Sequence, residues 1–137
     1  MREKEVKVLI VDDSKTIRTQ VAKTLNEAKL GYESYQAENG MEALEILEKV
    51  QGMDIIVSDI SMPEMDGMEL AKVLKGRQDL KNVEIVFFTT ECCLLMKLEA
   101  KEIGVRAWLP KPAKPDLLLG MMEKIRSKFC IKKEVTA

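Results

Sequence analysis

Residues 8–13 of this chain read Val8-Leu9-Ile10-Val11-Asp12-Asp13, an apolar run that ends in two carboxylates. A short apolar run of this kind is typical of a strand buried in a parallel sheet. Ligands of open α/β sheets bind at the carboxyl ends of the strands, so the residues that end such runs should meet on one rim. Three further runs end in a residue suited to holding a phosphoryl group: Asp54–Ser58 before Asp59, Val83–Phe88 before Thr89, and Ala107–Leu109, through Pro110, before Lys111.

Amphipathic stretches alternate with the apolar runs, which indicates βα units on a parallel sheet. Asn39 and Asp66, each followed three residues later by glutamate, are the expected caps of two helices. The strand at 33–37 is polar enough to be an edge strand. The expected strands are 6–11, 33–37, 54–58, 83–88 and 107–109, and the expected helices are 14–28, 39–50, 66–76, 94–103 and one that begins at 115 and buries Leu118, Met122, Ile125 and Phe129.

Length and composition predict a single globular domain. The 137 residues, 46% hydrophobic and 33% charged, are expected to form one domain over 1–137, with a core at about 6–128 and a short tail at 131–137. A net charge of −1 gives no electrostatic reason to bind nucleic acid or a membrane, and no apolar run is long enough to insert into one.

The cysteine and histidine content points to the cytoplasm and excludes several kinds of site. The N-terminus has no signal-peptide pattern, and Cys92, Cys93 and Cys130 form a poor disulfide framework, so we expect a reducing cytoplasm and packing or incidental roles for the thiols. The chain contains no histidine. This excludes Ser-His and Cys-His nucleophile pairs and any histidine ligand for zinc.

The residues at the expected rim have complementary chemistry. Asp12, Asp13 and Asp59 would repel one another unless a cation lay between them, and oxygen-only ligands favour Mg²⁺ or Mn²⁺. Lys111 would supply a positive charge, and Thr89 a hydroxyl donor, to phosphoryl oxygens. Asp12 and Asp13 lie side by side and suit the metal. Asp59 stands alone opposite Lys111 and Thr89, so we expect it to accept the phosphoryl group.

Four motifs together resemble the receiver domain of bacterial two-component response regulators. They are Val11-Asp12-Asp13-Ser14, the segment from Asp59 to Gly67, Phe88-Thr89-Thr90-Glu91 and Lys111-Pro112, and the resemblance covers about residues 6–128. It implies a flavodoxin-like α/β fold: a doubly wound five-stranded parallel sheet of order 2-1-3-4-5 with five helices. The chain is most similar to the stand-alone chemotaxis type of receiver, which Thr89-Thr90-Glu91 and Ala107-Trp108 also favour.

The resemblance implies a role for each residue of the rim. Asp59 would be the phosphoacceptor, and Mg²⁺ would be bound directly by Asp13, Asp59 and the backbone carbonyl of Ser61, with Asp12 acting through metal-bound water. Lys111 and Thr89 would contact the phosphoryl oxygens. Thr89 would also act in switching together with Trp108, which stands where the family usually has Tyr or Phe.

The expected partners are a histidine kinase, which donates the phosphoryl group, and a downstream protein target. The protein is expected to be a monomer or a weak phosphorylation-dependent dimer. More apolar residues than one buried face needs occur in helix 94–103, strand 107–109 and the helix from 115. Either a wide buried face or a partner surface that includes Leu95 and Met121 would explain this excess. A cis peptide bond before Pro112 would turn the amine of Lys111 back into the site.

The same residues bear on several other functions. An aspartate-based phosphatase of the haloacid dehalogenase type needs Asp-x-Asp and a cap insertion, whereas Asp12 and Asp13 are adjacent. A flavodoxin needs a phosphate-cradling loop after the first strand, where these carboxylates would repel phosphate. A receiver that cannot be phosphorylated is disfavoured because every site residue is present. A receiver excised from a larger response regulator or hybrid kinase stays open as an alternative.

Overall fold

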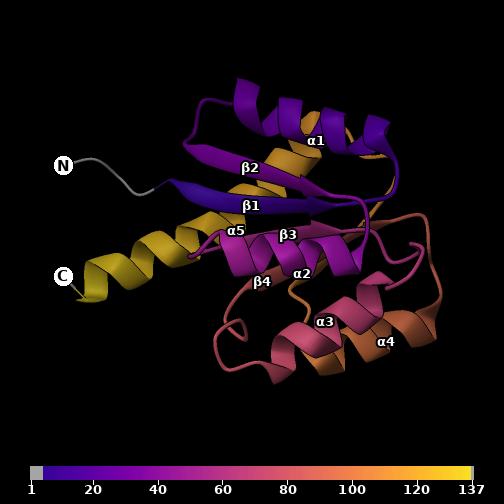
Figure 1. Ribbon diagram of the computed structural model, residues 1–137. Coiled ribbons are helices and arrows are strands. Elements are labelled where there is room, and N and C mark those ends of the chain that lie inside the picture. The colour runs from indigo at the N-terminus through magenta and orange to yellow at the C-terminus, as the bar shows by residue number, and fades with distance from the viewer. Residues whose placement is uncertain (1–4, 137) are drawn as a thin grey trace.

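The structure is a computed structural model that describes the backbone of residues 5–136 and the side chains of residues 5–127. Strands and helices alternate along the chain (Figure 1), as the apolar runs predict. The strands are β1 (Val6–Val11), β2 (Tyr32–Ala37), β3 (Ile55–Ser58), β4 (Glu84–Thr89) and β5 (Ala107–Pro110). The helices are α1 (Lys15–Glu27), α2 (Gly40–Lys49), α3 (Gly67–Gly76), α4 (Leu94–Ile103) and α5 (Pro115–Thr136).

The five strands form one parallel sheet in the order β2-β1-β3-β4-β5. This order confirms the predicted flavodoxin-like fold and places the polar strand β2 at an edge. Val11 pairs with Ser58 across β1 and β3, and Thr89 pairs with Pro110 across β4 and β5. The residues that follow these pairs therefore lie on one rim, where the chain places its carboxylates and Lys111.

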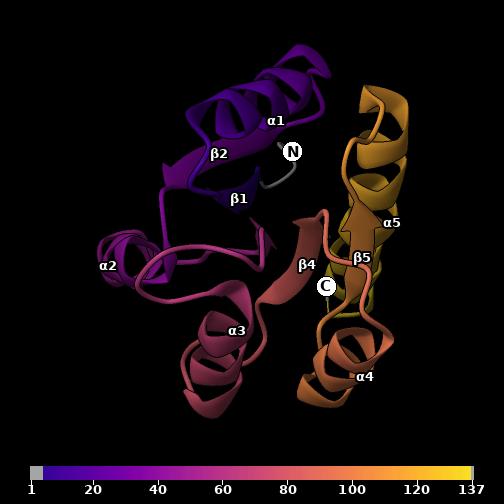
Figure 2. The same cartoon turned by 90° about the vertical axis from the view of Figure 1, so that its right-hand side faces the viewer.

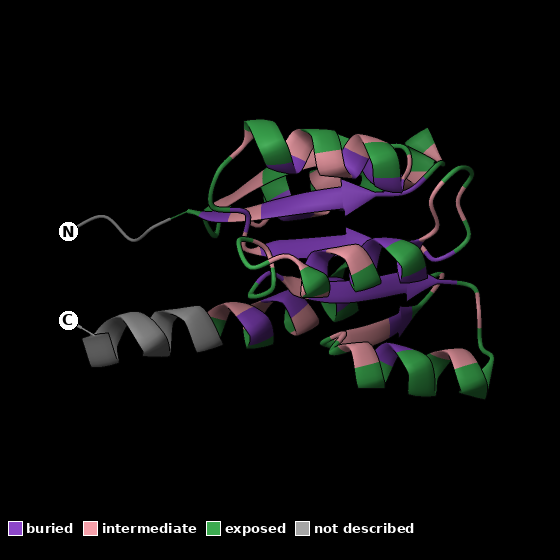
Figure 3. Ribbon diagram, turned by 60° about the horizontal axis from the view of Figure 1, so that its bottom comes forward, coloured by how far each residue is buried: buried purple, intermediate pink, exposed green. Residues whose placement is uncertain are grey.

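Helices cover both faces of the sheet (Figure 2), with α1 and α5 on one side and α2, α3 and α4 on the other. Alternate residues of β1 supply the two cores because successive side chains of a strand point to opposite faces. Leu9 and Val11 pack in the core with α2, α3 and α4, and Val8 and Ile10 pack in the core with α1 and α5. The central strands are accordingly buried almost throughout (Figure 3).

Three helices begin at side-chain caps that hold the polar loops of the rim in place. Ser14, Asn39 and Asp66 each accept a hydrogen bond from the backbone N–H three residues later. Such a cap stabilises a helix by about 1 kcal/mol, because it satisfies a backbone donor that has no partner within the helix. Two of these caps, Asn39 and Asp66, confirm the sequence prediction.

The structure adds to the sequence prediction at the C-terminal helix and at the cysteines. Helix α5 continues to Thr136, so the segment predicted as a tail from 131 is helical; the side chains of Phe129 and Cys130 lie outside the described residues. Cys92 and Cys93 are free and exposed, so of the two roles expected for these thiols, packing in the core is excluded and an incidental role remains. Within the described part of the chain, none of the helices has the length and apolar character needed to cross a membrane.

Candidate functional site

Three carboxylates meet at the carboxyl end of the sheet, as the sequence predicts. Asp12 and Asp13 follow β1, Asp59 follows β3, and one oxygen from each lies within 4.8 Å of the others. Asp12 is buried, Asp59 is half-buried and Asp13 is exposed. Three negative charges this close favour a bound cation, and a donor set made only of oxygen suits a hard divalent ion. The residues present therefore fit a divalent metal site.

Lys111 reaches this cluster from the loop after β5. Its Nζ donates to Asp12 Oδ2 at 2.6 Å and to Asp59 Oδ2 at 3.1 Å. Burial lowers the pKa of Lys111, but its hydrogen bonds with Asp12 and Asp59 and their negative charges outweigh that effect, so the net pKa is raised. The amine is therefore charged at neutral pH and balances part of the negative charge of the cluster.

The peptide bond between Lys111 and Pro112 is cis, as expected for an amine that turns back into the site. The backbone N–H of Lys111 donates to the carbonyl oxygen of Thr89 at 2.9 Å, which ties this loop to the end of β4. The ammonium group also lies 5.6 Å from the centre of the Phe88 ring. These contacts hold Lys111 at the rim from two adjacent strands.

Asp12 is held by contacts that the sequence analysis did not foresee. Its Oδ1 accepts a hydrogen bond from the backbone N–H of Ser14 at 2.9 Å, and its main-chain carbonyl accepts one from Nη1 of Arg18 at 2.7 Å. Arg18 is buried together with Val21 and Leu25, on the face of α1 that packs onto the sheet. Arg18 precedes Val21 by three residues and Leu25 by seven, so helical spacing places it on the same apolar stripe. This spacing is the sequence signal that could have identified Arg18 as a buried residue.

Gly67 closes the loop that carries Asp59. Its N–H donates to the carbonyl oxygen of Ile60 at 2.8 Å, and a Cβ placed on it would lie 2.2 Å from the carbonyl oxygen of Asp59. The Asp59 carboxylate itself accepts a hydrogen bond from the N–H of Ile60 at 2.7 Å. Only glycine therefore fits here without displacing the main chain of Asp59.

Thr89 and Ser61 both contact the same glutamate. The hydroxyl of Thr89 is buried and accepts a hydrogen bond from the backbone N–H of Glu91 at 3.2 Å, while Ser61 Oγ donates to Glu91 Oε1 at 3.1 Å. The loop after β3 and the loop after β4 are thus linked. Sequence analysis placed Ser61 and Thr89 on the rim but missed Glu91 as their common partner.

Trp108 lies on β5 and is half-buried. Its ring meets the ring of Phe87 edge-on at 5.8 Å, and Lys97 Nζ of α4 lies 5.6 Å from its centre. Trp108 therefore contacts both the central sheet and α4, a position from which movement of its ring would alter the surface.

Helix α4 exposes apolar side chains, which favours the partner-surface explanation over a wide buried face. Leu94, Leu95 and Leu98 are 68%, 75% and 50% exposed, and only Ala100 of this helix is buried. On α5, Leu117 is exposed, whereas Met121 is half-buried against the core shared with α1. Of the two explanations for the apolar residues, the half-buried Met121 therefore fits a wide buried face on α5, whereas the exposed leucines of α4 fit a partner surface.

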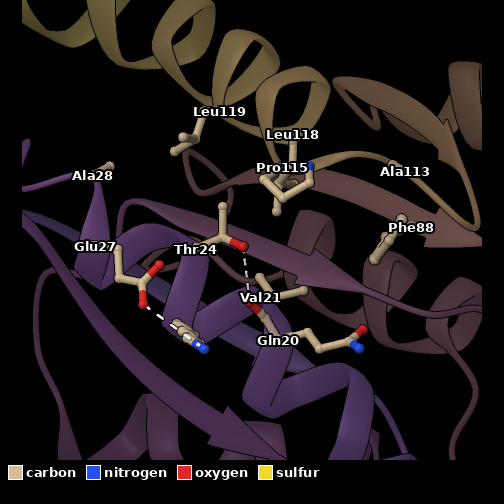
Figure 4. A pocket seen from close by; sticks show the side chains of 11 residues that line it. Gln20, Val21, Thr24, Glu27, Ala28, Phe88, Ala113, Pro115, Leu118 and Leu119 are labelled. Atoms are coloured by element: carbon tan, nitrogen blue, oxygen red, sulfur yellow. Dashed lines mark hydrogen bonds and ion pairs between the residues drawn. The ribbon is translucent and has the colours of Figure 1, made fainter.

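A cavity of about 550 Å³ lies between α1 and α5 (Figure 4). Its walls are apolar on the side of α5, with Leu118 and Leu119, and partly polar on the side of α1, with Gln20 and Thr24. Asp12, Asp13 and Asp59 do not line this cavity, which approaches the rim through Phe88. The chemistry therefore belongs to the open rim of the sheet and not to this cavity.

The chain matches the family described as "Response regulator receiver domain" over residues 8–123. The chain belongs to this family. It is therefore a phosphoaccepting signalling domain and not a catalytic enzyme, and family membership implies a histidine kinase as partner. The match confirms the resemblance that the four sequence motifs carried.

Several relatives of this receiver domain are chemotaxis proteins. A chemotaxis protein CheY homolog of Campylobacter jejuni is 33% identical over 121 residues, which cover 88% of this chain and 92% of the relative. Chemotaxis protein CheY1 of Helicobacter pylori is 35% identical over 121 residues, 88% of this chain and 96% of the relative.

Solved structures agree with this family membership. The structure of chemotaxis response regulator CheY4 of Vibrio cholerae has a TM-score of 0.80 and 40% identity, and the match covers 88% of this chain and 98% of that one. The Mn(2+)-bound form of response regulator Rcp1 has a TM-score of 0.76 and 26% identity, covering 89% of this chain and 92% of the other.

Proposed function

We propose that Asp59 accepts a phosphoryl group from a histidine of a separate kinase. The observation that carries this proposal is the position of Lys111, whose charged amine lies 3.1 Å from an Asp59 oxygen. A carboxylate can attack phosphorus when nearby positive charge offsets the negative charge of the incoming group. The Asp59 side chain is also more exposed than that of Asp12, at 12% against 3%.

A divalent ion, Mg²⁺ or Mn²⁺, would be held by Asp13, Asp59 and the backbone carbonyl of Ser61, with Asp12 bound through water. Support comes from the three convergent carboxylates and from the Mn(2+)-bound form of the relative Rcp1. When bound, the ion supplies positive charge that neutralises the phosphoryl oxygens.

In the transfer step, an Asp59 carboxylate oxygen attacks phosphorus, a P–O bond forms and the P–N bond to the kinase histidine breaks. The leaving nitrogen keeps the bonding electron pair and remains with the kinase. Lys111 holds a phosphoryl oxygen through its ammonium group, and the hydroxyl of Thr89 donates to another. The product is an acyl phosphate, which water hydrolyses, so the signal is transient.

Incubation with acetyl phosphate and Mg²⁺ tests this function. We expect intact-protein mass spectrometry to show one added phosphoryl group, since a small donor can replace the kinase when the domain itself positions the reacting groups. Removal of the metal with EDTA is expected to abolish the gain. An unmodified protein at saturating donor and metal would contradict the proposal.

Thr89 and Trp108 are proposed to transmit the change to the surface. The Thr89 O–H would donate to a phosphoryl oxygen, and this charge-assisted hydrogen bond would draw the threonine toward Asp59 and stretch the weaker bond that its oxygen accepts from the N–H of Glu91. The space left near β5 would let the ring of Trp108 move and shift an existing equilibrium.

Tryptophan fluorescence tests this switch, because Trp108 is the chain's one tryptophan. We expect the emission to change when Mg²⁺ binds and again when beryllofluoride, a phosphoryl mimic, is added. In Thr89→Ala the second change should shrink while Asp59 is still modified by acetyl phosphate. A second change of full size in Thr89→Ala would show that Trp108 is not coupled through Thr89.

The surface formed by α4, β5 and α5 is proposed to bind the downstream protein. Leu94, Leu95 and Leu98 of α4 are largely exposed, and Lys97 of the same helix lies near the ring of Trp108. Exposed apolar area bordered by charge often marks an interface. The names of the relatives favour a chemotaxis role. We further propose that the protein acts in the cytoplasm as a single receiver domain over 1–137, as a monomer or weak phosphorylation-dependent dimer.

Leu95→Glu is expected to weaken binding of the phosphorylated protein to its target by roughly tenfold or more, since a central apolar contact contributes about 2 kcal/mol. The change should leave modification of Asp59 intact. Met41→Glu, on an exposed apolar residue of α2, is the matched control and should bind normally. The measurement first isolates the target protein that binds to the beryllofluoride-treated wild type and then titrates it against each variant. Equal affinity of the target for Leu95→Glu and for wild type would exclude this surface as the binding site.

A further inference from the structure

Arg18 is a buried arginine that connects three parts of the chain next to the carboxylates. It lies on α1 with 8% of its surface exposed. Nη1 donates to the main-chain carbonyl of Asp12 at 2.7 Å, and Nε donates to Oε1 of Gln36 on β2 at 3.2 Å. Nη2 lies 4.0 Å from the carboxylate of Glu38, just beyond β2. The guanidinium thus joins α1, the end of β1 and the edge strand.

The carbonyl oxygen that Arg18 holds belongs to the peptide unit between Asp12 and Asp13. Fixing this oxygen fixes the plane of that peptide, and with it the directions in which the two neighbouring carboxylates leave the chain. A buried hydrogen bond from a charged donor is stronger than one between neutral groups. The planar guanidinium also meets Asp12 and Gln36 at once, which a lysine ammonium cannot do with the same geometry.

We propose that Arg18 is a positioning residue that holds Asp12 and Asp13 in the geometry that binds the divalent ion. This inference rests on the proposed metal-dependent function of the rim. Arg18 does not contact the ion or the phosphoryl group. Its effect passes through the main chain of Asp12, as partners behind metal ligands commonly act on metal affinity.

Whether replacement of Arg18 weakens or tightens metal binding separates a positioning role from simple electrostatic repulsion. The positive charge of Arg18 repels a cation, so removal of the charge alone would tighten Mg²⁺ binding. Loss of the hydrogen bond to the Asp12 carbonyl would weaken binding, because the carboxylates would no longer be oriented. Arg18→Met removes charge and hydrogen bond together, and Arg18→Lys keeps the charge while losing the shape of the guanidinium.

The experiment is calorimetric titration of metal-free protein with Mn²⁺, without any phosphoryl donor. We expect Arg18→Met and Arg18→Lys each to raise the Kd for Mn²⁺ by roughly tenfold or more. Gln36→Ala, which removes only the partner of Nε, should give a smaller increase that is not additive with Arg18→Met, because the two side chains act as one unit. Arg77→Met is the matched control, because Arg77 pairs with Glu48 and Asp79 beyond the C-terminal end of α3. The Kd of this variant for Mn²⁺ should equal that of the wild type.

Unfolding by urea in EDTA gives the second readout. A purely structural role would lower the stability of the metal-free variants but leave the Kd of the folded protein unchanged, and that result would overturn the proposal. Tighter Mn²⁺ binding by Arg18→Met would also overturn it, in favour of electrostatic repulsion. If Arg18→Met does not fold, Gln36→Ala, on an exposed strand residue, decides the matter alone. Failure of wild type to bind Mn²⁺ would instead contradict the proposed function.

Discussion

Asp59→Asn is expected to abolish phosphorylation by acetyl phosphate in the presence of Mg²⁺. An amide oxygen is a far weaker nucleophile than a carboxylate, and the substitution removes one of the three negative charges that favour the metal. Lys111 would also lose one of its two charged partners. Intact-protein mass spectrometry would show an unmodified protein under conditions that modify the wild type.

Asp66→Asn provides a matched control for this loss. Asp66 lies in the same loop and caps α3 by accepting a hydrogen bond from the N–H of Glu69 at 2.8 Å, a role that asparagine performs equally well. The control should therefore be modified at the wild-type level. Modification of Asp59→Asn to the same extent as Asp66→Asn would exclude Asp59 as the acceptor.

Lys111→Met should have the second large effect: it should lower the stability of the metal-free protein and raise its affinity for Mg²⁺. The Lys111 side chain is 12% exposed and pairs with Asp12 and Asp59, whose side chains are 3% and 12% exposed. Removing one partner of a buried ion pair leaves charge uncompensated, so the metal-free variant should lose about 3–5 kcal/mol of unfolding free energy. Mg²⁺ should bind the variant more tightly, because the amine no longer competes for the carboxylates.

Urea unfolding with EDTA and with saturating Mg²⁺ measures both effects. The metal should recover more stability in Lys111→Met than in wild type, since stabilisation by a ligand rises with its affinity. Lys114→Met, at an exposed lysine three residues later, is the control and should behave as wild type. Weaker Mg²⁺ binding by Lys111→Met would show that the lysine does not oppose the metal. Arg18→Met is expected to weaken metal binding instead. The two variants therefore distinguish a residue that competes with the metal, Lys111, from one that positions the metal ligands, Arg18.

Much of the fold was predictable because local signals and burial agree. The predicted strand 6–11 has the bounds of β1, and Asn39 and Asp66 cap helices as their spacing with glutamate indicates. The convergence of Asp12, Asp13 and Asp59 follows from strand order, since parallel strands end on one rim. These features depend on neighbours in sequence or on the general rule for open α/β sheets.

The features that could not be predicted depend on how wide a buried face becomes after packing. The sequence left open whether Met121 is buried or belongs to an exposed patch, and packing against the core that α5 shares with α1 half-buries it. Arg18 was overlooked because an arginine is rarely buried without a partner, and its partners on Asp12 and Gln36 come from two different strand regions. Helical spacing gives the direction of a face, whereas its width is set by tertiary contacts.

The fit of Gly67 against Asp59 has a consequence for genetic screens. Gly67→Ala would remove no charge, hydroxyl or metal ligand. The added Cβ would nevertheless clash with the main-chain carbonyl oxygen of Asp59, because the two atoms would lie 2.2 Å apart. A screen for lost signalling would therefore recover this allele alongside Asp59→Asn, with the same phenotype and an opposite cause. The first would retain the acceptor and displace it, and the second would retain the backbone and lose the nucleophile.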